Sequence, residues 1–424
     1  MRRPSCRAHI STTWITDRFR LILRYRFKFP FKAAEVGFLF DRLRPREIPM
    51  RHIGIRLFLA ASVLAISASS AIAANITREI WGTTSTGEEV DLYTLRGAGG
   101  VVARISNYGG VIVGLDVPDR DGKKADIVLG YDNFEAYQRG GFYGALIGRF
   151  ANRINNASFK LGGQTIMLDH RENSLVVLHS GAAGLNRRVW TGKPHDGAEP
   201  SLELSVLDPD GSGGMPGNVN VTVTYTLTKN NELKVDYRAT TDKPTVVNFT
   251  NHSYFNLAGE GSGAVDNELL QLFADQYTPS DDKLIPTGQL ATVKGTAIDF
   301  TSPKRVGDAL NSDFPEIVTR HGMDINFVVR GNPGTLRPAA RLEDPKSGRV
   351  MEVLTTQPGI QIFSDNKRQP SIGKGGKSYV NHSALTFESQ HYPDSPNQPD
   401  FPSTEITPAR PMHEVTVFRF SAHK

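Results

Sequence analysis

The 424-residue sequence has almost no cysteine, and its single thiol, Cys6, lies near the start of the chain. A chain with one cysteine cannot close an internal disulfide, and it offers no set of thiolates for a structural zinc site. After residue 6, no cysteine remains to act as a nucleophile. Disulfide-stapled, thiolate-zinc and thiol-dependent classes of protein are therefore excluded for the main body of the chain.

Long apolar runs are also missing, because no stretch after residue 74 approaches the roughly 20 apolar residues of a membrane-spanning helix. The one short apolar core, residues 57–66, follows a basic start at Met50 and precedes the small residues Ala71-Ile72-Ala73-Ala74. This order is typical of a secretory signal peptide. We expect residues 50–74 to be a cleaved signal and residues 1–49 to be an extension upstream of the true start. An uncleaved anchor with a basic tail is the alternative.

The signal pattern predicts that the mature protein is exported, to the periplasm or the medium, and keeps no stable association with membranes. It also accounts for the positive charge of the chain. The net charge is +5, but residues 1–73 alone hold 14 Lys or Arg against four Asp or Glu, which leaves −5 for the rest. A mildly acidic body without basic runs lacks the electrostatic footprint of a nucleic-acid-binding protein. We therefore expect no nucleic-acid partner.

Amphipathic helical patterns are scarce as well, and only residues 133–138 suggest a short helix. What is present instead is alternation with period two, which indicates strands buried on one face. Residues 219–227 and 233–239 alternate around a Lys-Asn-Asn turn and predict a hairpin, and 40 Gly and 25 Pro supply many further turns. Other strands are expected at 202–206, 246–257, 350–354, 384–389 and 415–420. The sequence thus predicts an all-β fold, a large antiparallel β-sandwich in a single domain over residues 75–424.

Two of these strands carry polar groups where an apolar face is expected. Alternation places Asn248, Thr250, His252, Tyr254 and Asn256 on one face of the strand at 246–257. A row of hydrogen-bonding groups suits a cleft for a polyhydroxylated ligand, since in a core many of them would be unsatisfied. In the strand at 384–389, Glu388 and Thr386 lie opposite Leu385 and Phe387. Taken alone, a strand glutamate such as Glu388 is more often a solvated edge residue, and a histidine such as His252 is more often a hydrogen-bonded core residue.

Motifs in a fixed order then reveal a resemblance. They are Asn-Tyr-Gly-Gly (107–110), Gly-Ala-Leu-Ile-Gly-Arg-Phe-Ala-Asn-Arg-Ile (144–154), Leu-His-Ser-Gly (178–181), Asn-His-Ser-Tyr-Phe-Asn-Leu (251–257), Gly-Met-Asp (322–324), Thr-Thr-Gln-Pro-Gly-Ile-Gln (355–361) and Phe-Glu-Ser-Gln-His-Tyr-Pro-Asp (387–394). Over residues 76–421 the chain resembles the aldose 1-epimerase (galactose mutarotase) family. The resemblance implies a galactose mutarotase-like supersandwich and the interconversion of the α and β anomers of a free aldose such as glucose or galactose.

The resemblance also assigns roles to residues. It implies that Glu388 is the general base and His252 the general acid, and that no metal or other cofactor takes part. Ring opening of a hemiacetal needs one group to remove the C1 hydroxyl proton while another protonates the ring oxygen. A carboxylate close to His252 would raise the pKa of the imidazole toward the working range. The residues that the family pattern implies for sugar binding are Asn152, Arg153, His179, Asp324 and Gln361, with the register of Ala-Asn-Arg-Ile selecting Arg153 over Arg149.

The chain departs from the family pattern beside the expected pocket. Ser180 replaces the usual glycine of Leu-His-Gly-Gly, the interval from Arg153 to His179 is about one residue longer, and Met323 and Ile325 replace the usual Tyr and His around Asp324. These departures leave the preferred aldose open. Two other functions also stay open: a non-catalytic carbohydrate-binding protein on the same scaffold, and a glycoside hydrolase that would need Asp324 as its second carboxylate.

Overall fold

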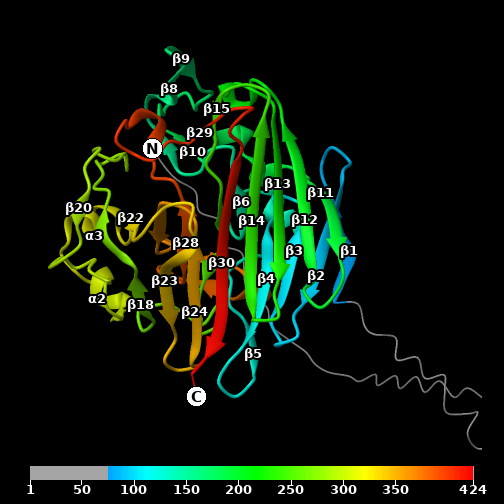
Figure 1. The fold of residues 1–424 in the computed structure, drawn as a ribbon. Coiled ribbons are helices and arrows are strands. Elements are labelled where there is room, and N and C mark those ends of the chain that lie inside the picture. Colours follow the sequence, from blue (N-terminus) through cyan, green and yellow to red (C-terminus); the bar gives the residue numbers. More distant parts are fainter. Residues whose placement is uncertain (1–74, 424) are drawn as a thin grey trace, which may run out of the picture. The chain divides into compact units, whose positions relative to one another are not determined.

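The computed structural model describes residues 75–423. The predicted signal peptide at 50–74 and the extension at 1–49 lie outside the described residues. None of the helices between residues 75 and 423 has the length and apolar character of a membrane span. The strands within this range are joined in antiparallel ladders, and they build three large sheets (Figure 1).

A nine-stranded sheet forms one layer of the fold (Figure 1). Its strands, in spatial order, are β11 (Thr191–His195), β12 (Ser201–Asp208), β13 (Val219–Leu227), β14 (Glu232–Thr241), β30 (Met412–Ala422), β24 (Arg349–Thr355), β23 (Arg337–Glu343), β18 (Leu269–Leu272) and β21 (Lys304–Arg305). The expected hairpin is confirmed, because β13 and β14 pair from Val219↔Thr241 to Leu227↔Leu233. The last long strand, β30, lies between β14 and β24 and so joins the two halves of the sheet.

Two further sheets make the opposing layer. The five-stranded sheet contains β1 (Ile76–Thr83), β2 (Glu89–Arg96), β3 (Val102–Ser106), β4 (Ile112–Pro118) and β5 (Lys124–Asp126). The six-stranded sheet contains β17 (Tyr254–Phe255), β28 (Leu385–Gln390), β25 (Gly359–Phe363), β22 (Asp324–Val329), β19 (Ala274–Tyr277) and β20 (Ala291–Thr292). The predicted fold class, a large antiparallel β-sandwich, is confirmed.

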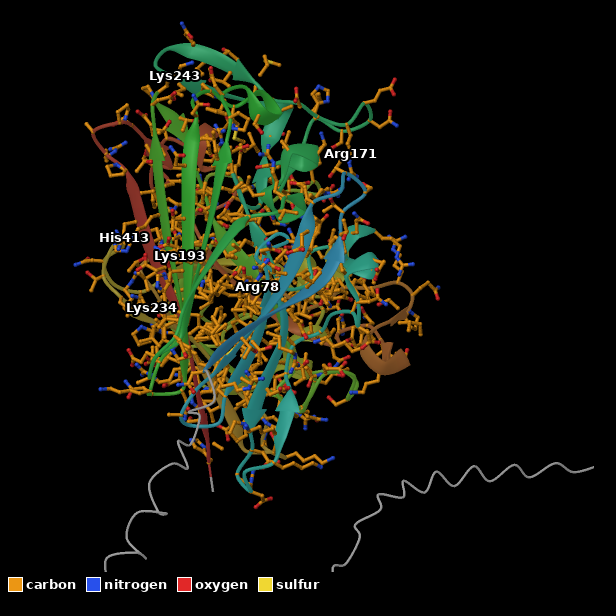
Figure 2. The ribbon with its side chains drawn as sticks, turned by 90° about the vertical axis from the view of Figure 1, so that its right-hand side faces the viewer. Arg78, Arg171, Lys193, Lys234, Lys243 and His413 are labelled. Carbon is orange, nitrogen blue, oxygen red and sulfur yellow. The ribbon has the colours of Figure 1, made fainter. Side chains whose placement is uncertain are left out.

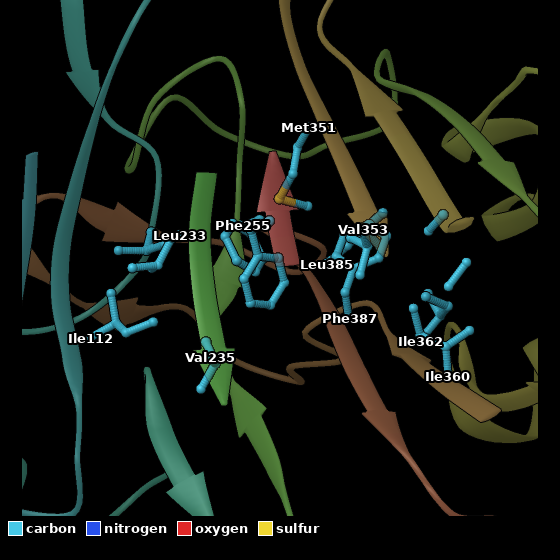
Figure 3. Packing of buried hydrophobic residues seen from close by; sticks show 14 of the residues in the cluster. Ile112, Leu233, Val235, Phe255, Met351, Val353, Ile360, Ile362, Leu385 and Phe387 are labelled. Atoms are coloured by element: carbon cyan, nitrogen blue, oxygen red, sulfur yellow. The ribbon is translucent and has the colours of Figure 1, made fainter. Parts of the chain in front are cut away.

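The core lies between these layers. Figure 3 shows Val353 of β24 beside Leu385 and Phe387 of β28, with Ile362 of β25 next to them and Val235 of β14 farther off in the same apolar cluster. Alternation explains why the strands pack in this way, since Lys234 points to the outer surface of β14 (Figure 2) while Val235 points inward. The same rule leaves Glu388, next to Phe387, on the face of β28 that points away from this core.

Short elements connect the sheets. The helix expected at 133–138 is confirmed as α1 (Phe134–Gln138), where the side chain of Asn133 caps the helix by accepting from the backbone N–H of Ala136. Two other short helices, α2 (Val306–Leu310) and α3 (Pro315–Arg320), follow later in the chain. The two-stranded ladders are β7 (Arg153–Ile154) with β10 (Val177–Leu178), β8 (Ser158–Leu161) with β9 (Gln164–Met167), β15 (Thr245–Val246) with β29 (Glu405–Ile406), β16 (Thr250–His252) with β6 (Ala145–Ile147), and β26 (Ser371–Ile372) with β27 (Ser378–Tyr379).

One strand prediction was wrong, because residues 246–257 form three short strands with three different partners instead of one continuous strand. β15 pairs with β29, β16 with β6, and β17 with β28. Between β16 and β17, the side chain of Asn251 accepts hydrogen bonds from the backbone N–H and the hydroxyl of Ser253. Such local side-chain bonds compete with the ladder. Because of this break, β16 pairs with β6 in the N-terminal part of the described chain, whereas β17 pairs with β28.

Candidate active site

His252 and Glu388 come from separate strands and meet in the interior. His252 ends β16, and Glu388 lies in β28, the strand that also pairs with β17. The Nε2 atom of His252 is 3.5 Å from Oε1 of Glu388. Both residues are buried, with exposed fractions of 5% and 2%. The structure thus brings together an imidazole and a carboxyl group that lie 136 positions apart in the printed sequence.

The environment of Glu388 favours its protonated form. Its Oε1 accepts a hydrogen bond of 3.0 Å from the hydroxyl of Thr386, two residues earlier on the same face of β28. Its Oε2 is buried and has no hydrogen-bond partner among the described residues. Burial raises the pKa of Glu388 to about 8, and the nearby charge of Asp324 adds to the effect, while Thr386 and Arg153 oppose it. In the free protein, this carboxyl group is therefore protonated near neutral pH.

The expectation that the carboxylate would raise the pKa of His252 was wrong. Burial lowers the pKa of His252 to about 4, and the opposing effect of Asp324 is smaller. The Nδ1 atom of His252 also has no partner among residues 75–423. Since neither group is readily charged in this buried environment, the pair holds one titratable proton, on Glu388, over a wide range around neutral pH, while His252 is a neutral imidazole.

A polar network lies beside the pair and contains four of the predicted sugar-binding residues. The amide of Gln361 donates to Oδ1 of Asp324 at 2.6 Å, and Arg153 donates to Oδ2 at 3.3 Å. Arg153 also donates to Oδ1 of Asn152 at 3.2 Å. The antiparallel register of β25 places Gln361 opposite Glu388 of β28, so the network adjoins the pair directly. The carbonyl oxygen of the Gln361 side chain has no protein partner in the described range and is available to a ligand.

His179, the remaining predicted residue, is held in place by hydrogen bonds to the backbone of Asn152. Its Nδ1 accepts the backbone N–H of Asn152 at 3.0 Å, and its own backbone N–H donates to the carbonyl of Asn152 at 2.8 Å. Both residues have left-handed backbone conformations, with φ of 51° and 63°, which cluster at functional sites in many proteins. The His179 ring lies edge-on to His252 with 5.4 Å between ring centroids. The structure therefore joins His179 to the same site.

This arrangement makes His179 a hydrogen-bond donor. Burial, the charge of His252 and the charge of Arg153 all hold the pKa of His179 well below its ordinary value, so its ring is neutral. A neutral imidazole carries one proton, and because Nδ1 accepts a hydrogen bond, the proton must reside on Nε2. The Nε2–H group can donate to an oxygen atom of a ligand.

The same observation bears on metal binding. Ligand atoms of His179, His252 and Glu388 lie within 4.8 Å of one another, a set that could surround a cation. A histidine that binds a metal through Nε2 needs its proton on Nδ1, where it donates to a second group. In His179 the Nδ1 atom accepts from the N–H of Asn152. The donor set therefore fits hydrogen bonding to a ligand better than coordination of a metal ion.

The polar network opens to the surface of the described body. A small pocket is lined by Asn152, Arg153, Asp324 and Gln361, together with groups of neighbouring loops. Arg153 also lines an adjacent cleft of about 560 Å³, whose wall includes Phe142, Leu178 and Arg187. Polar groups at the inner end and a roomy cleft outside are features of a site for a polar small molecule.

Several residues singled out in the sequence have structural roles instead. Asn248 donates to the carbonyls of Ala151 and His391, and Asn256 donates to those of Gly263 and Ser383, so neither was correctly assigned to a polar ligand-facing row. The reason is the break in the predicted strand, which sends its parts to different partners.

The two arginines of the motif have different surroundings. Arg149 is buried in an ion pair with Asp208, 2.7 Å apart, and donates to three backbone carbonyls. The sequence reasoning missed Phe142, whose ring lies against both His179 and His252. Its position after Gly140-Gly141, just before the Gly-Ala-Leu-Ile-Gly-Arg motif, was the only available signal.

A large antiparallel sandwich with a buried imidazole–carboxyl pair beside a polar network defines an acid–base site for a polar ligand, and comparison with known proteins gives the class. The family model described as aldose 1-epimerase matches residues 91–419. The chain belongs to the aldose 1-epimerase family.

Individual relatives agree with this result. The chain is 39% identical to galactose mutarotase of Homo sapiens over 353 residues, which is 82% of this chain and 99% of the relative. It is 34% identical to aldose 1-epimerase of Escherichia coli K12, over 79% of this chain and 96% of the relative. Among solved structures, a galactose 1-epimerase from Lactobacillus acidophilus is 28% identical with a TM-score of 0.73, over 83% of this chain and all of that one. The protein is therefore an isomerase with mutarotase activity, and its substrate is a sugar.

Proposed function

We propose that Glu388 and His252 interconvert the α and β anomers of a free aldohexose such as galactose or glucose, with Glu388 as the base and His252 as the acid. The observation that carries this proposal is the 3.5 Å contact between the two side chains, next to the network of Asp324, Gln361 and Arg153. Relatives named galactose mutarotase support galactose as one substrate.

The reaction begins with a proton shift inside the pair. In the protein alone, the proton resides on Glu388. A sugar hydroxyl that donates to the unpaired Oε2 would stabilise the carboxylate, and Arg153 favours the same form. Asp324 favours the imidazolium form of His252. Binding of the sugar would thus convert a neutral pair into a carboxylate and an imidazolium without any change in the total number of protons.

Ring opening then returns the pair to its first state. Glu388 takes the proton of the C1 hydroxyl, the bond between C1 and the ring oxygen breaks, and His252 gives its proton to that oxygen. The products are an open-chain aldehyde, a protonated Glu388 and a neutral His252. After rotation about the C1–C2 bond, the ring closes on the other face of the aldehyde and both proton transfers run in reverse. The open-chain intermediate therefore matches the protonation state that burial favours.

The remaining predicted residues would orient the sugar. Asp324 and the side-chain carbonyl of Gln361 would accept from hydroxyl groups, while Arg153, Asn152 and the Nε2–H of His179 would donate. Fixing the sugar ring in this way keeps C1 and the ring oxygen against the acid–base pair during the reaction.

Polarimetry of freshly dissolved α-D-galactose and α-D-glucose tests this proposal. The purified protein should speed the decay of optical rotation far above the buffer rate, and a rate equal to that of buffer would overturn the proposal and favour a non-catalytic binding protein. Oligosaccharides provide a second arm: release of new reducing ends that depends on Glu388 would instead favour a glycoside hydrolase.

We propose further that the protein is exported by the segment 50–74. Its basic start, short apolar core and small residues at 71–74 support this assignment. Expression of the full chain in a bacterium, followed by N-terminal sequencing of the periplasmic fraction, should give a start near residue 75. Recovery of the protein only from the cytoplasm with its first residues intact would contradict export.

A further inference from the structure

We propose that Phe142 is a positioning residue that holds the imidazole of His252 against Glu388 and stabilises its charged form during ring opening. The inference rests on the proposed function of His252 as the acid. It concerns a residue outside the predicted site, on the loop between α1 and β6.

The imidazole of His252 is stacked against two aromatic side chains. The Phe142 ring lies nearly parallel to the imidazole, with 5.5 Å between centroids and an interplanar angle of 23°. The Tyr254 ring is also nearly parallel to it, at 5.0 Å and 26°.

Two aromatic faces favour the charged imidazole over the neutral one. An aromatic ring carries negative charge density on its face, so a cation held over that face is stabilised. The imidazolium of His252 forms when the sugar binds and gives up its proton in ring opening. Because burial disfavours this charged form, a contact that stabilises it raises the fraction of the complex that can react, and so raises kcat. The ring of Phe142 therefore acts on the proton transfer through His252, without touching the reacting atoms in this structure.

Phe142 also lies in the wall of the cleft. Its ring lines the cleft of about 560 Å³, whereas His252 does not. Phe142 packs edge-on to His179 as well, with 4.8 Å between centroids. One side chain thus contacts both histidines and lines the cleft, so its ring takes up space that water would otherwise occupy beside them. Excluding water strengthens each charge interaction inside the site.

The backbone before Phe142 explains how the ring reaches this position. Gly140 and Gly141 have φ of 112° and 110°, a conformation that residues with a Cβ rarely adopt. This double glycine turns the loop so that Phe142 points inward before β6 begins at Ala145. A side chain at residue 141 would meet no atom within 4 Å, so Gly141→Ala tests the backbone conformation without creating a collision.

Other charged and polar groups around His252 also affect its pKa. Asp324 from β22 favours the imidazolium, and Glu388 from β28 lies 3.5 Å from Nε2. His179 and Arg153 are nearby donors or cations. None of them changes in a variant at residue 142. A difference between ring-containing and ring-free variants therefore reports on the aromatic contact itself.

The experiment compares Phe142→Tyr, which keeps the ring, with Phe142→Leu, which removes it but keeps an apolar side chain. In Phe142→Leu we expect kcat for galactose to fall roughly 3- to 30-fold, the range of one partly buried cation–π contact, with a smaller change in KM. NMR titration of His252 with galactose bound should show a lower pKa than in the wild type. Phe142→Tyr should keep both kcat and the titration near wild-type values. Leu178→Ala, in the cleft wall, should change KM more than kcat.

Three outcomes would overturn this role: an unchanged kcat in Phe142→Leu, a rise in KM alone, or an equal loss in Phe142→Tyr. If Phe142→Leu does not fold, as judged by circular dichroism, Gly141→Ala takes its place and should lower kcat while the ring is retained but displaced. An unchanged kcat in a folded Gly141→Ala protein would then overturn the role. Failure of the proposed function itself is separate, because the wild-type protein would then not accelerate mutarotation.

Discussion

At the scale of single residues, the chemistry depends on the carboxyl group of Glu388. It has one oxygen bound to Thr386 and one without a protein partner, so a sugar hydroxyl can complete its hydrogen bonding. Glu388 is buried among groups that tolerate a neutral side chain, and an amide has nearly the same shape as a protonated carboxyl group. Removing only the proton-transfer ability of this residue is therefore possible with little change in packing.

The variant Glu388→Gln should lose roughly 10²- to 10⁴-fold in kcat, the usual contribution of one positioned acid–base group. Because shape and burial are retained, the variant should still bind galactose in a calorimetric titration. A matched control is Gln361→Glu on the neighbouring strand, which adds a carboxyl group beside the site and should not restore activity to Glu388→Gln. Retention of wild-type kcat in Glu388→Gln would contradict the role of base.

The rate should also depend on pH, because it depends on the protonation states of His252 and Glu388. Active enzyme holds one titratable proton on the two groups, so kcat/KM should be bell-shaped. On the acid side, activity should fall near pH 4, where His252 gains a proton while Glu388 keeps its own. On the basic side, it should fall near pH 8, where Glu388 loses the proton of the pair. A profile that is flat from pH 4 to pH 9 in initial-rate polarimetry would contradict a shared proton.

At the scale of structural elements, the site depends on the segment around β6 and β7, which supplies Arg149, Asn152 and Arg153. The two arginines are four positions apart and have different functions. Arg153 faces the polar network, and Arg149 binds Asp208 at the end of β12 and the carbonyls of Pro209 and Pro216. Arg149 thereby fastens the active-site segment to the nine-stranded sheet.

Substitution of Arg149 by Met should therefore act on stability. Removing one partner of a buried ion pair typically lowers the free energy of unfolding by about 3–5 kcal/mol. Because Asp208 would keep the half-buried Arg188 at 3.4 Å, we expect a loss of about 3 kcal/mol, at the lower end of this range. Urea unfolding followed by fluorescence measures this change. Arg153→Met is the matched control, since its ion pair with Asp324 is more exposed; it should lose less stability and more activity. Equal stability of the two variants would contradict this division.

The strands also show which parts of the fold can be predicted from the sequence. Alternation in 219–227 and 233–239 predicted β13 and β14 closely, because each strand has one apolar and one polar face. The same reasoning failed for residues 246–257, where both faces become buried and Asn251 bonds locally to Ser253. Alternation of apolar and polar residues identifies strands that are buried on one face. It does not show where a segment changes from one partner strand to another.

The site itself was predictable only in part. Strand geometry singled out His252 and Glu388, and the family resemblance added Asn152, Arg153 and His179. Neither could give the proton positions, because the pKa of each group depends on burial by elements distant in the sequence. Phe142 escaped prediction for a similar reason, since its contacts with the histidines exist only after the loop from α1 has folded back.

At the scale of the whole molecule, the described body is a sandwich whose rigid core lies on one side of β28 and whose site lies on the other. Leu385 and Phe387 belong to the core, and Thr386 and Glu388 face the site. A single strand thus connects packing with chemistry, and the protein needs only its own side chains for the proposed proton transfers.

Removal of metal ions should accordingly leave the activity unchanged. Dialysis against EDTA, followed by polarimetry in metal-free buffer, should give the same kcat as the untreated protein. Because Nδ1 of His179 accepts a backbone N–H, added Zn²⁺ should not raise the rate either. A loss of activity on dialysis that is recovered with a divalent cation would show that His179, His252 and Glu388 do hold a metal.

The most direct test of the account is a crystal structure of the Glu388→Gln protein with galactose bound. The account predicts that the C1 oxygen lies within hydrogen-bond distance of the side chain at position 388 and that the ring oxygen lies against Nε2 of His252. Asp324 and Arg153 should contact hydroxyl groups elsewhere on the ring. A sugar bound with C1 and the ring oxygen pointing away from both residues would contradict the proposed acid–base pair.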